Sequence, residues 1–284
     1  MGGIIWLASY PKSGNTWLRI FLTNLRRDGE EPVNINDLDG GPIASARGVF
    51  DELTGLEASD LTPEEIDQLR PEVYERLTAR AKETLFLKVH DAYTYTADGQ
   101  PLLAAGGSRA IYLIRNPLDV AVSFANHASR DLDTIIGRMA DAECTLSANA
   151  CQLSEQLRQR LLSWSAHVLS WVEAPIPVQV LRYEDMKQQP LGTFSEAARF
   201  AGLPAEPERV RKAVAFSDFK ELQRQEQEGG FRERPSQAES FFREDGWGAW
   251  RRELTSEQAA RVIRDHQKVM QRFGYITAEG EPVF

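Results

Sequence analysis

The chain contains 284 residues, of which 42% are hydrophobic and 26% are charged, an ordinary composition for a globular protein. Its 33 Lys and Arg against 42 Asp and Glu give a net charge of −9, which argues against a general nucleic-acid binder with a basic surface. No apolar run approaches the ~18 residues of a membrane span, and the first residues lack the pattern of a signal peptide. We therefore expect a cytoplasmic protein with neither a nucleic-acid nor a membrane partner.

The N-terminal segment predicts a strand, a loop and a helix in succession. The apolar run at residues 3–9 (GIIWLAS) predicts a buried strand, and helical periodicity follows over residues 15–27. The loop between them contains Lys12 and Gly14. Because a helix N-terminus offers unpaired N–H groups to an anion, this order predicts a phosphate cradle.

Strands and helices alternate along the rest of the chain. Further strands are predicted at residues 84–89, 109–114 and 178–181, and helices at 62–80, 117–129, 152–172, 188–201 and 255–274. The acidic residues 28–60 are predicted to be irregular, and the polar residues 223–246 to form a mobile flap. The alternation predicts a single α/β domain over residues 1–284, with a mostly parallel sheet flanked by helices.

The predicted loop differs from the loop of common ATPases. A Walker A loop has Gly-x-x-x-x-Gly-Lys-Ser/Thr, whereas here Ser9 stands at the first Gly and Asn15 at the Lys. The lysine, Lys12, lies before Gly14 instead. A small-molecule kinase using ATP and Mg remains the alternative on these residues alone.

Four segments resemble one family in the same order. Residues 10–17 (YPKSGNTW) are similar to the 5′-phosphosulfate loop of the cytosolic-type sulfotransferases, which use 3′-phosphoadenosine 5′-phosphosulfate (PAPS) as donor. Residues 112–124 (YLIRNPLDVAVSF) resemble the family's 3′-phosphate motif, residues 181–186 (LRYEDM) its Tyr-Glu-Asp turn, and residues 241–255 its C-terminal segment. The resemblance implies a P-loop-like fold and sulfuryl transfer from PAPS to a hydroxyl of a small molecule, such as a phenol, alcohol or natural product.

The resemblance also assigns roles to individual residues. It implies His90 as the catalytic base, Lys88 as a second cation near the transferred group, and Lys12 as the cation that stabilises charge on the leaving 5′-phosphate. No metal ion is expected. Donor contacts are implied for Lys12, Ser13, Gly14, Asn15, Thr16, Trp17, Arg115, Ser123, Tyr183, Ser217, Phe219 and Arg243.

The chain departs from the family in its C-terminal segment. Where the family has Arg-Lys-Gly, this sequence has Arg243-Glu244-Asp245, and two carboxylates would repel a dianionic phosphate. The family's short dimer motif is not evident around residues 251–257, so the oligomeric state stays open.

Cys144 and Cys151 predict buried thiols in a reducing compartment rather than a disulfide framework. His127, His167 and His266 belong to no motif and are expected to have core or surface roles.

Overall fold

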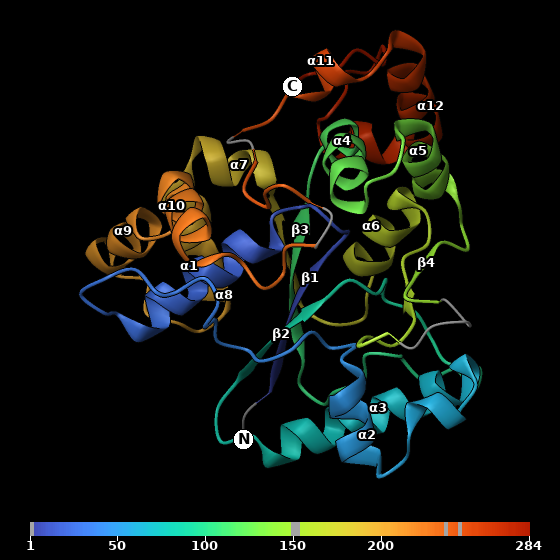
Figure 1. Ribbon diagram of the computed structural model, residues 1–284, viewed down its shortest axis with the longest axis vertical. Coiled ribbons are helices and arrows are strands. Elements are labelled where there is room, and N and C mark those ends of the chain that lie inside the picture. Colours follow the sequence, from blue (N-terminus) through green and yellow to red (C-terminus); the bar gives the residue numbers. More distant parts are fainter. Residues whose placement is uncertain (1–2, 149–153, 236–237, 244–245) are drawn as a thin grey trace. The chain divides into compact units, whose positions relative to one another are not determined.

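The computed structural model describes residues 3–148, 154–235, 238–243 and 246–284 (Figure 1). Its main sheet has the strand order β2-β1-β3-β6, which confirms the predicted α/β class with a parallel central sheet flanked by helices. The chain divides into two compact units. Unit 1 comprises Met1–Tyr10, Gly40–Tyr112 and Asp141–Val180, and unit 2 comprises Pro11–Asp39, Leu113–Ala140 and Leu181–Phe284.

Unit 1 contains the two strands that carry the first candidate residues. Strands β1 (Ile4–Ser9) and β2 (Leu85–Val89) pair in parallel, with Leu7 opposite Lys88. Every residue of β1 is buried, as expected for a strand that is covered on both faces. Ser9 therefore ends β1, and His90 directly follows β2, at the carboxyl ends of neighbouring parallel strands, where α/β proteins place their ligands.

The remaining elements of unit 1 include one accurate prediction and two errors. Helix α3 (Pro63–Arg80) confirms the helix predicted over residues 62–80, and Thr62 and Glu65 form a capping box at its start, with reciprocal hydrogen bonds. The helix predicted over residues 152–172 is wrong in its first half: α6 begins only at Trp164, and residues 159–160 form β5. Residues 28–60 are not wholly irregular, since they contain α2 and η1. The bounds are α2 Arg47–Thr54, η1 Ala58–Asp60, α3 Pro63–Arg80, β4 Thr145–Leu146, β5 Gln159–Arg160 and α6 Trp164–Val172.

Unit 2 is mainly helical. Helices α4, α5 and α12 pack together, and α9 packs against both α1 and α8 (Figure 1). Strands β3 (Arg109–Ile114) and β6 (Val178–Arg182) begin in unit 1 and end in unit 2. The helices are α1 Asn15–Arg27, α4 Pro117–Ala128, α5 Leu132–Ala140, α7 Tyr183–Gln188, α8 Pro190–Phe200, α9 Pro207–Ala215, α10 Phe219–Gly229, α11 Trp250–Glu253 and α12 Ser256–Arg272.

An apolar cluster in unit 2 anchors part of the predicted flap. Phe231 and Phe242 are buried against Ile20, Ile35 and Leu222. The start of the predicted flap, residues 223–229, belongs to α10. Mobility of residues 223–246 and the single-domain boundary at 1–284 both stay predictions.

Two further sequence observations can be placed in the structure. Among the described residues, no helix combines the length and apolar character needed to cross a membrane. Cys144 is buried, as predicted, whereas Cys151 lies outside the described residues.

Candidate active site

The loop between β1 and α1 has the backbone conformation of an anion cradle. Lys12 has a φ of 68° and Gly14 a φ of 98°, both in the left-handed region. Helix α1 begins directly afterwards, and no side chain caps its N-terminus. The first N–H groups of a helix lack partners within the helix, and backbone of mixed handedness turns successive N–H groups toward one point. The loop in unit 2 therefore has the backbone geometry that the predicted phosphate cradle requires.

Gly14 and Tyr183 are in close contact. A Cβ atom at residue 14 would lie 2.8 Å from Cδ2 of Tyr183, which is closer than real side chains approach. The position also has the positive φ that side-chain-bearing residues rarely adopt. Glycine is thus required here both by the backbone and by the tyrosine ring, and the loop and the Tyr-Glu-Asp turn are fitted to each other.

Lys12 contacts two residues that the sequence did not assign to the site. Its Nζ lies 3.4 Å from Nδ1 of His127 and 4.1 Å from the centre of the Phe241 ring. His127 was expected to have a core or surface role, and it instead contacts the cradle lysine. Its only sequence signal is its place in α4, the helix that also carries Ser123.

Arg115 connects the cradle to the Tyr-Glu-Asp turn. Its Nη1 donates to the carbonyl oxygen of Lys12 at 3.0 Å, and its guanidinium lies 4.3 Å from the centre of the Tyr183 ring. Among the described residues, buried Nε of Arg115 and buried Oγ of Ser13 have no hydrogen-bond partner. Buried polar groups are normally satisfied, so these two donors are suited to an anionic ligand. Ser123, on the following helix, is half-buried.

Four of the residues implied as donor contacts, Trp17, Tyr183, Ser217 and Phe219, form a second group. Trp17 Nε1 donates to the carbonyl oxygen of Ser217 at 2.9 Å, and the Trp17 ring meets the Tyr183 ring edge-on. The Lys187 ammonium lies 4.5 Å from the Trp17 ring and 5.2 Å from the Phe219 ring. Trp17 is therefore packed between predicted donor contacts, while its indole nitrogen also holds the segment at Ser217 in place.

Arg243 forms an ion pair within the C-terminal segment. Its Nη2 pairs with Oε1 of Glu253 at 2.7 Å. The adjacent Glu244 and Asp245, on which the predicted repulsion depends, lie outside the described residues. A contact of Arg243 with the 3′-phosphate stays a prediction, as do the donor contacts of Asn15 and Thr16, both buried in the first turn of α1.

Asp119 is an organising residue that sequence reasoning missed. It is buried in the first turn of α4 and its carboxylate accepts the backbone N–H groups of Gly248, at 2.9 Å, and Trp250, at 3.3 Å. It therefore ties the C-terminal segment to the helix that carries Ser123. The available signal was the position of Asp119 inside the 3′-phosphate motif, where no role was assigned to it.

In unit 1, His90 is held by the end of strand β1. Its Nδ1 donates to the carbonyl oxygen of Ser9 at 2.9 Å, and Ser9 Oγ lies 3.3 Å from the same nitrogen. A nitrogen that donates to a carbonyl carries the proton, so in the neutral ring Nε2 carries the lone pair. Lys88 lies half-buried in β2, two positions before His90 on the chain. In this tautomer Nε2 is the ring nitrogen that can accept a proton.

The fold belongs to the α/β class with a parallel central sheet, and comparison with known proteins identifies the family. Residues 4–274 match the sulfotransferase domain, so the chain belongs to the sulfotransferase family and is a transferase. The kinase alternative is not favoured.

Individual relatives are distant. The chain is 22% identical to flavonol 3-sulfotransferase of Flaveria bidentis, covering 91% of this chain and 78% of the relative. It is 23% identical to cytosolic sulfotransferase 17 of Arabidopsis thaliana, covering 96% and 76%. The crystal structure of mouse sulfotransferase SULT7A1 complexed with PAP has a TM-score of 0.59 at 18% identity, covering 98% of this chain and 86% of that one. This last likeness supports the fold.

Proposed function

We propose that this protein transfers the sulfuryl group of PAPS to a hydroxyl of a small-molecule acceptor. The observation that carries the proposal is the cradle in unit 2, where the left-handed Lys12 and Gly14 precede an uncapped helix beside the buried donors Ser13 Oγ and Arg115 Nε. These groups suit an anion with several phosphate oxygens. The mouse relative's complex with PAP, the adenosine 3′,5′-bisphosphate product of such a transfer, supports PAPS as the donor.

The donor is held by the residues of unit 2. The loop from Lys12 to Trp17 binds the 5′-phosphosulfate, while Arg115, Ser123 and Arg243 bind the 3′-phosphate. Tyr183, Ser217 and Phe219 lie against the nucleoside. The planar Arg115 fork can donate two parallel hydrogen bonds to phosphate oxygens, and Lys12 stabilises the charge that develops on the leaving 5′-phosphate.

His90 activates the acceptor. Its Nε2 takes the hydroxyl proton while the acceptor oxygen forms a bond to sulfur, and the bond from sulfur to the 5′-phosphate oxygen breaks. The products are a sulfate ester and PAP, and the proton stays on His90 until it passes to solvent. Lys88 acts as a second cation near the transferred group. Positioning and charge stabilisation supply the catalysis, as in phosphoryl transfer. Because a sulfuryl group carries less charge than a phosphoryl group, we expect cationic side chains and backbone N–H groups to suffice without a metal ion.

Aromatic residues that follow His90 support a phenol, or another hydroxyl compound with an apolar body, as acceptor. The Tyr93 ring lies 5.5 Å from the Trp171 ring and 6.0 Å from the Tyr95 ring, centre to centre. Tyr95 is 49% exposed and so presents an apolar ring to solvent. The Flaveria relative is named for a flavonol, a phenolic acceptor, and the name of the Arabidopsis relative supports a cytoplasmic location.

A binding experiment tests the donor assignment. Thermal unfolding is measured with PAP, with ADP, and with ATP plus magnesium. A ligand at 100 times its dissociation constant stabilises by about 2.7 kcal/mol, so PAP should raise the melting temperature by several degrees. A shift with ATP and magnesium alone would contradict the proposal.

A variant tests the base. His90→Ala should bind PAP as the wild type does, because the cradle is unchanged, and should lose at least ~10²-fold in sulfuryl transfer from PAPS. Unchanged turnover would refute the role of His90 while leaving the donor assignment intact.

A further inference from the structure

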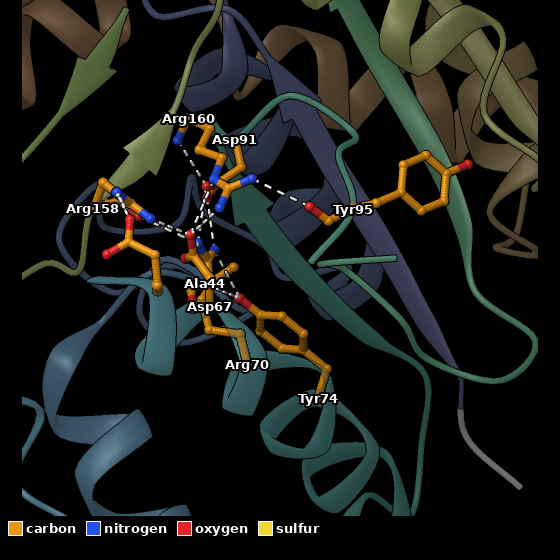
Figure 2. A network of polar contacts seen from close by, with 9 residues as sticks. Ala44, Asp67, Arg70, Tyr74, Asp91, Tyr95, Arg158 and Arg160 are labelled. Atoms are coloured by element: carbon orange, nitrogen blue, oxygen red, sulfur yellow. Dashed lines mark hydrogen bonds and ion pairs between the residues drawn. The ribbon is translucent and has the colours of Figure 1, made fainter. Parts of the chain in front are cut away.

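The residue after His90 carries a buried charge. Asp91 is 0% exposed, and its carboxylate receives two hydrogen bonds from the guanidinium of Arg70, which is 1% exposed (Figure 2). Nη1 and Nη2 of Arg70 donate to Oδ1 and Oδ2 of Asp91 at 3.0 and 2.7 Å. Asp91 Oδ1 also accepts the backbone N–H of Arg160 at 3.1 Å. Asp91 is thus held in a fixed orientation from α3 and from β5.

Arg70 is itself held on its other sides. Its Nε and Nη2 donate to the Tyr74 hydroxyl at 3.1 and 3.0 Å, and that hydroxyl donates to the carbonyl oxygen of Ala44 at 3.1 Å (Figure 2). Arg70 Nη1 also donates to the carbonyl oxygen of Arg158 at 3.3 Å. The guanidinium therefore has partners on all of its nitrogens and cannot turn without breaking several hydrogen bonds.

The charges around the pair are balanced by Asp67. This carboxylate, 2% exposed, lies 3.7 Å from Arg70 and accepts from Arg158 at 2.6 Å and from Arg160 at 2.7 Å. Arg158 also pairs with Glu64 at the surface. Three arginines thus face three carboxylates within unit 1. A buried ion pair is expensive to desolvate, and apolar residues of similar volume would often give a fold as stable. The network therefore calls for an explanation other than stability.

The backbone of His90 and Asp91 is fixed at the same place by α6. His167 Nε2 donates to the carbonyl oxygen of His90 at 3.0 Å, and Trp171 Nε1 donates to the carbonyl oxygen of Asp91 at 3.0 Å. Burial lowers the pKa of His167 to about 4, so this histidine is neutral and keeps one tautomer at ordinary pH. Two peptide carbonyls and one side chain therefore lock the segment that presents the His90 ring to Ser9.

We propose that Arg70 and Asp91 are positioning residues for His90. The bidentate pair fixes the backbone on which the imidazole stands, so that Nδ1 stays hydrogen-bonded to the Ser9 carbonyl and Nε2 keeps the lone pair. The inference rests on the proposed role of His90 as base. It extends that role to residues that touch neither the donor nor the acceptor.

The primary test reads the His90 ring directly. Long-range ¹H–¹⁵N spectra of the wild type, with the His90 signals assigned by their loss in His90→Ala, should show the single Nδ1–H tautomer. Arg70→Lys keeps a buried positive charge beside Asp91, but it loses the bidentate contact. Arg70→Met/Asp91→Leu removes both charges together and fills the space. In both variants we expect a mixture of tautomers at His90.

A kinetic test accompanies it. PAP formation from PAPS is followed with 2-naphthol as a phenol probe, and PAP affinity is measured by calorimetry. The variants should lose at least tenfold in kcat, while the dissociation constant of PAP stays within twofold, because the cradle is not part of the network. Glu72→Gln, at an exposed ion pair on the same helix, is the matched control and should leave both readouts unchanged.

The outcomes are distinguishable. A folded Arg70→Lys or double variant with a single Nδ1–H tautomer and a kcat within threefold of the wild type overturns the positioning role. If instead His90→Ala retains full turnover, the proposed function of His90 fails. The tautomer spectra still decide in that case whether the Arg70–Asp91 pair orients the ring.

Discussion

Substitution of Gly14 by Ala tests whether the cradle and the Tyr183 ring form one unit. The added Cβ would lie 2.8 Å from Cδ2 and 3.3 Å from Cε2 of Tyr183, on a backbone with a φ of 98°. A positive φ costs a residue with a side chain about 1–2 kcal/mol, and forcing an atom into a packed site costs about 1–3 kcal/mol. We expect a loss of about 3 kcal/mol in the free energy of unfolding.

The effect on donor binding should exceed what stability alone implies. Relief of the overlap requires the Tyr183 ring to move, and the Arg115 guanidinium lies 4.3 Å from the centre of that ring. The substitution therefore disturbs the loop, the ring and the arginine together. We expect PAP affinity to fall at least tenfold, which corresponds to about 1.4 kcal/mol.

Gly55→Ala is the matched control. Gly55 also has a positive φ, 74°, but nothing lies within 4 Å of its added Cβ. This variant should lose only the positive-φ cost of about 1–2 kcal/mol and bind PAP normally. Urea unfolding measures the stability of both variants, and calorimetry measures PAP affinity. If Gly14→Ala matched Gly55→Ala in stability and bound PAP like the wild type, the coupling to Tyr183 would be refuted.

Two other predictions concern acid stability and the C-terminal segment. Burial lowers the pKa of His167 and of His266 to about 4, so the unfolded chain binds protons that the folded chain does not between pH 6.5 and 4. The contribution of these neutral histidines to the free energy of unfolding is fully present above pH 6.5. It should fall by about 3 kcal/mol per histidine toward pH 4, at ~1.36 kcal/mol per pKa unit. Urea unfolding at several pH values between 7 and 4 measures this loss, and His266→Leu should remove the part of the loss that His266 contributes. Asp119→Asn keeps the side-chain shape but weakens the charge-assisted bonds to Gly248 and Trp250, so PAP affinity should fall about threefold to tenfold in calorimetry.

The parts of the fold that the sequence predicted well are those specified by neighbouring residues. The apolar run of β1 and the glycine before α1 set a boundary that lies within one residue of the prediction. The capping boxes at Thr62 and Thr255 mark helix starts through hydrogen bonds that span a single turn. The family resemblance of residues 10–17 could be recognised for the same reason, since that motif is one short segment.

The helix predicted across residues 152–163 failed for a reason outside the segment. Leu157 and Leu161 recur at helical spacing, and both are buried. The backbone is nevertheless extended at β5, where Gln159 pairs with Leu146 of β4. Burial by partners that are distant along the chain imposed a strand on a pattern that is equally compatible with a helix.

The same distinction separates the site residues that were found from those that were missed. Lys12 and His90 lie in motifs, whereas His127 reaches Lys12 from a separate helix and has no local signal. Arg70 lies in α3 and Asp91 in the loop after β2, and each alone resembles an ordinary charged surface residue in the sequence. Only the folded chain shows that both are buried and that each is the other's partner.

The short connection from β1 to α1 contains both the residue that contacts His90 and the lysine of the cradle. Ser9, which ends β1, fixes the tautomer of His90, and Lys12 of the cradle follows shortly afterwards on the same chain. A substitution in this short connection should therefore alter both the hydrogen bond that orients His90 and the backbone proposed to bind the anion. Changes in the Arg70–Asp91 pair act on the base alone. Substitutions in the β1–α1 connection should alter both PAP affinity and kcat, whereas substitutions of Arg70 or Asp91 should alter kcat alone. Comparing the two sets should therefore separate donor binding from proton transfer.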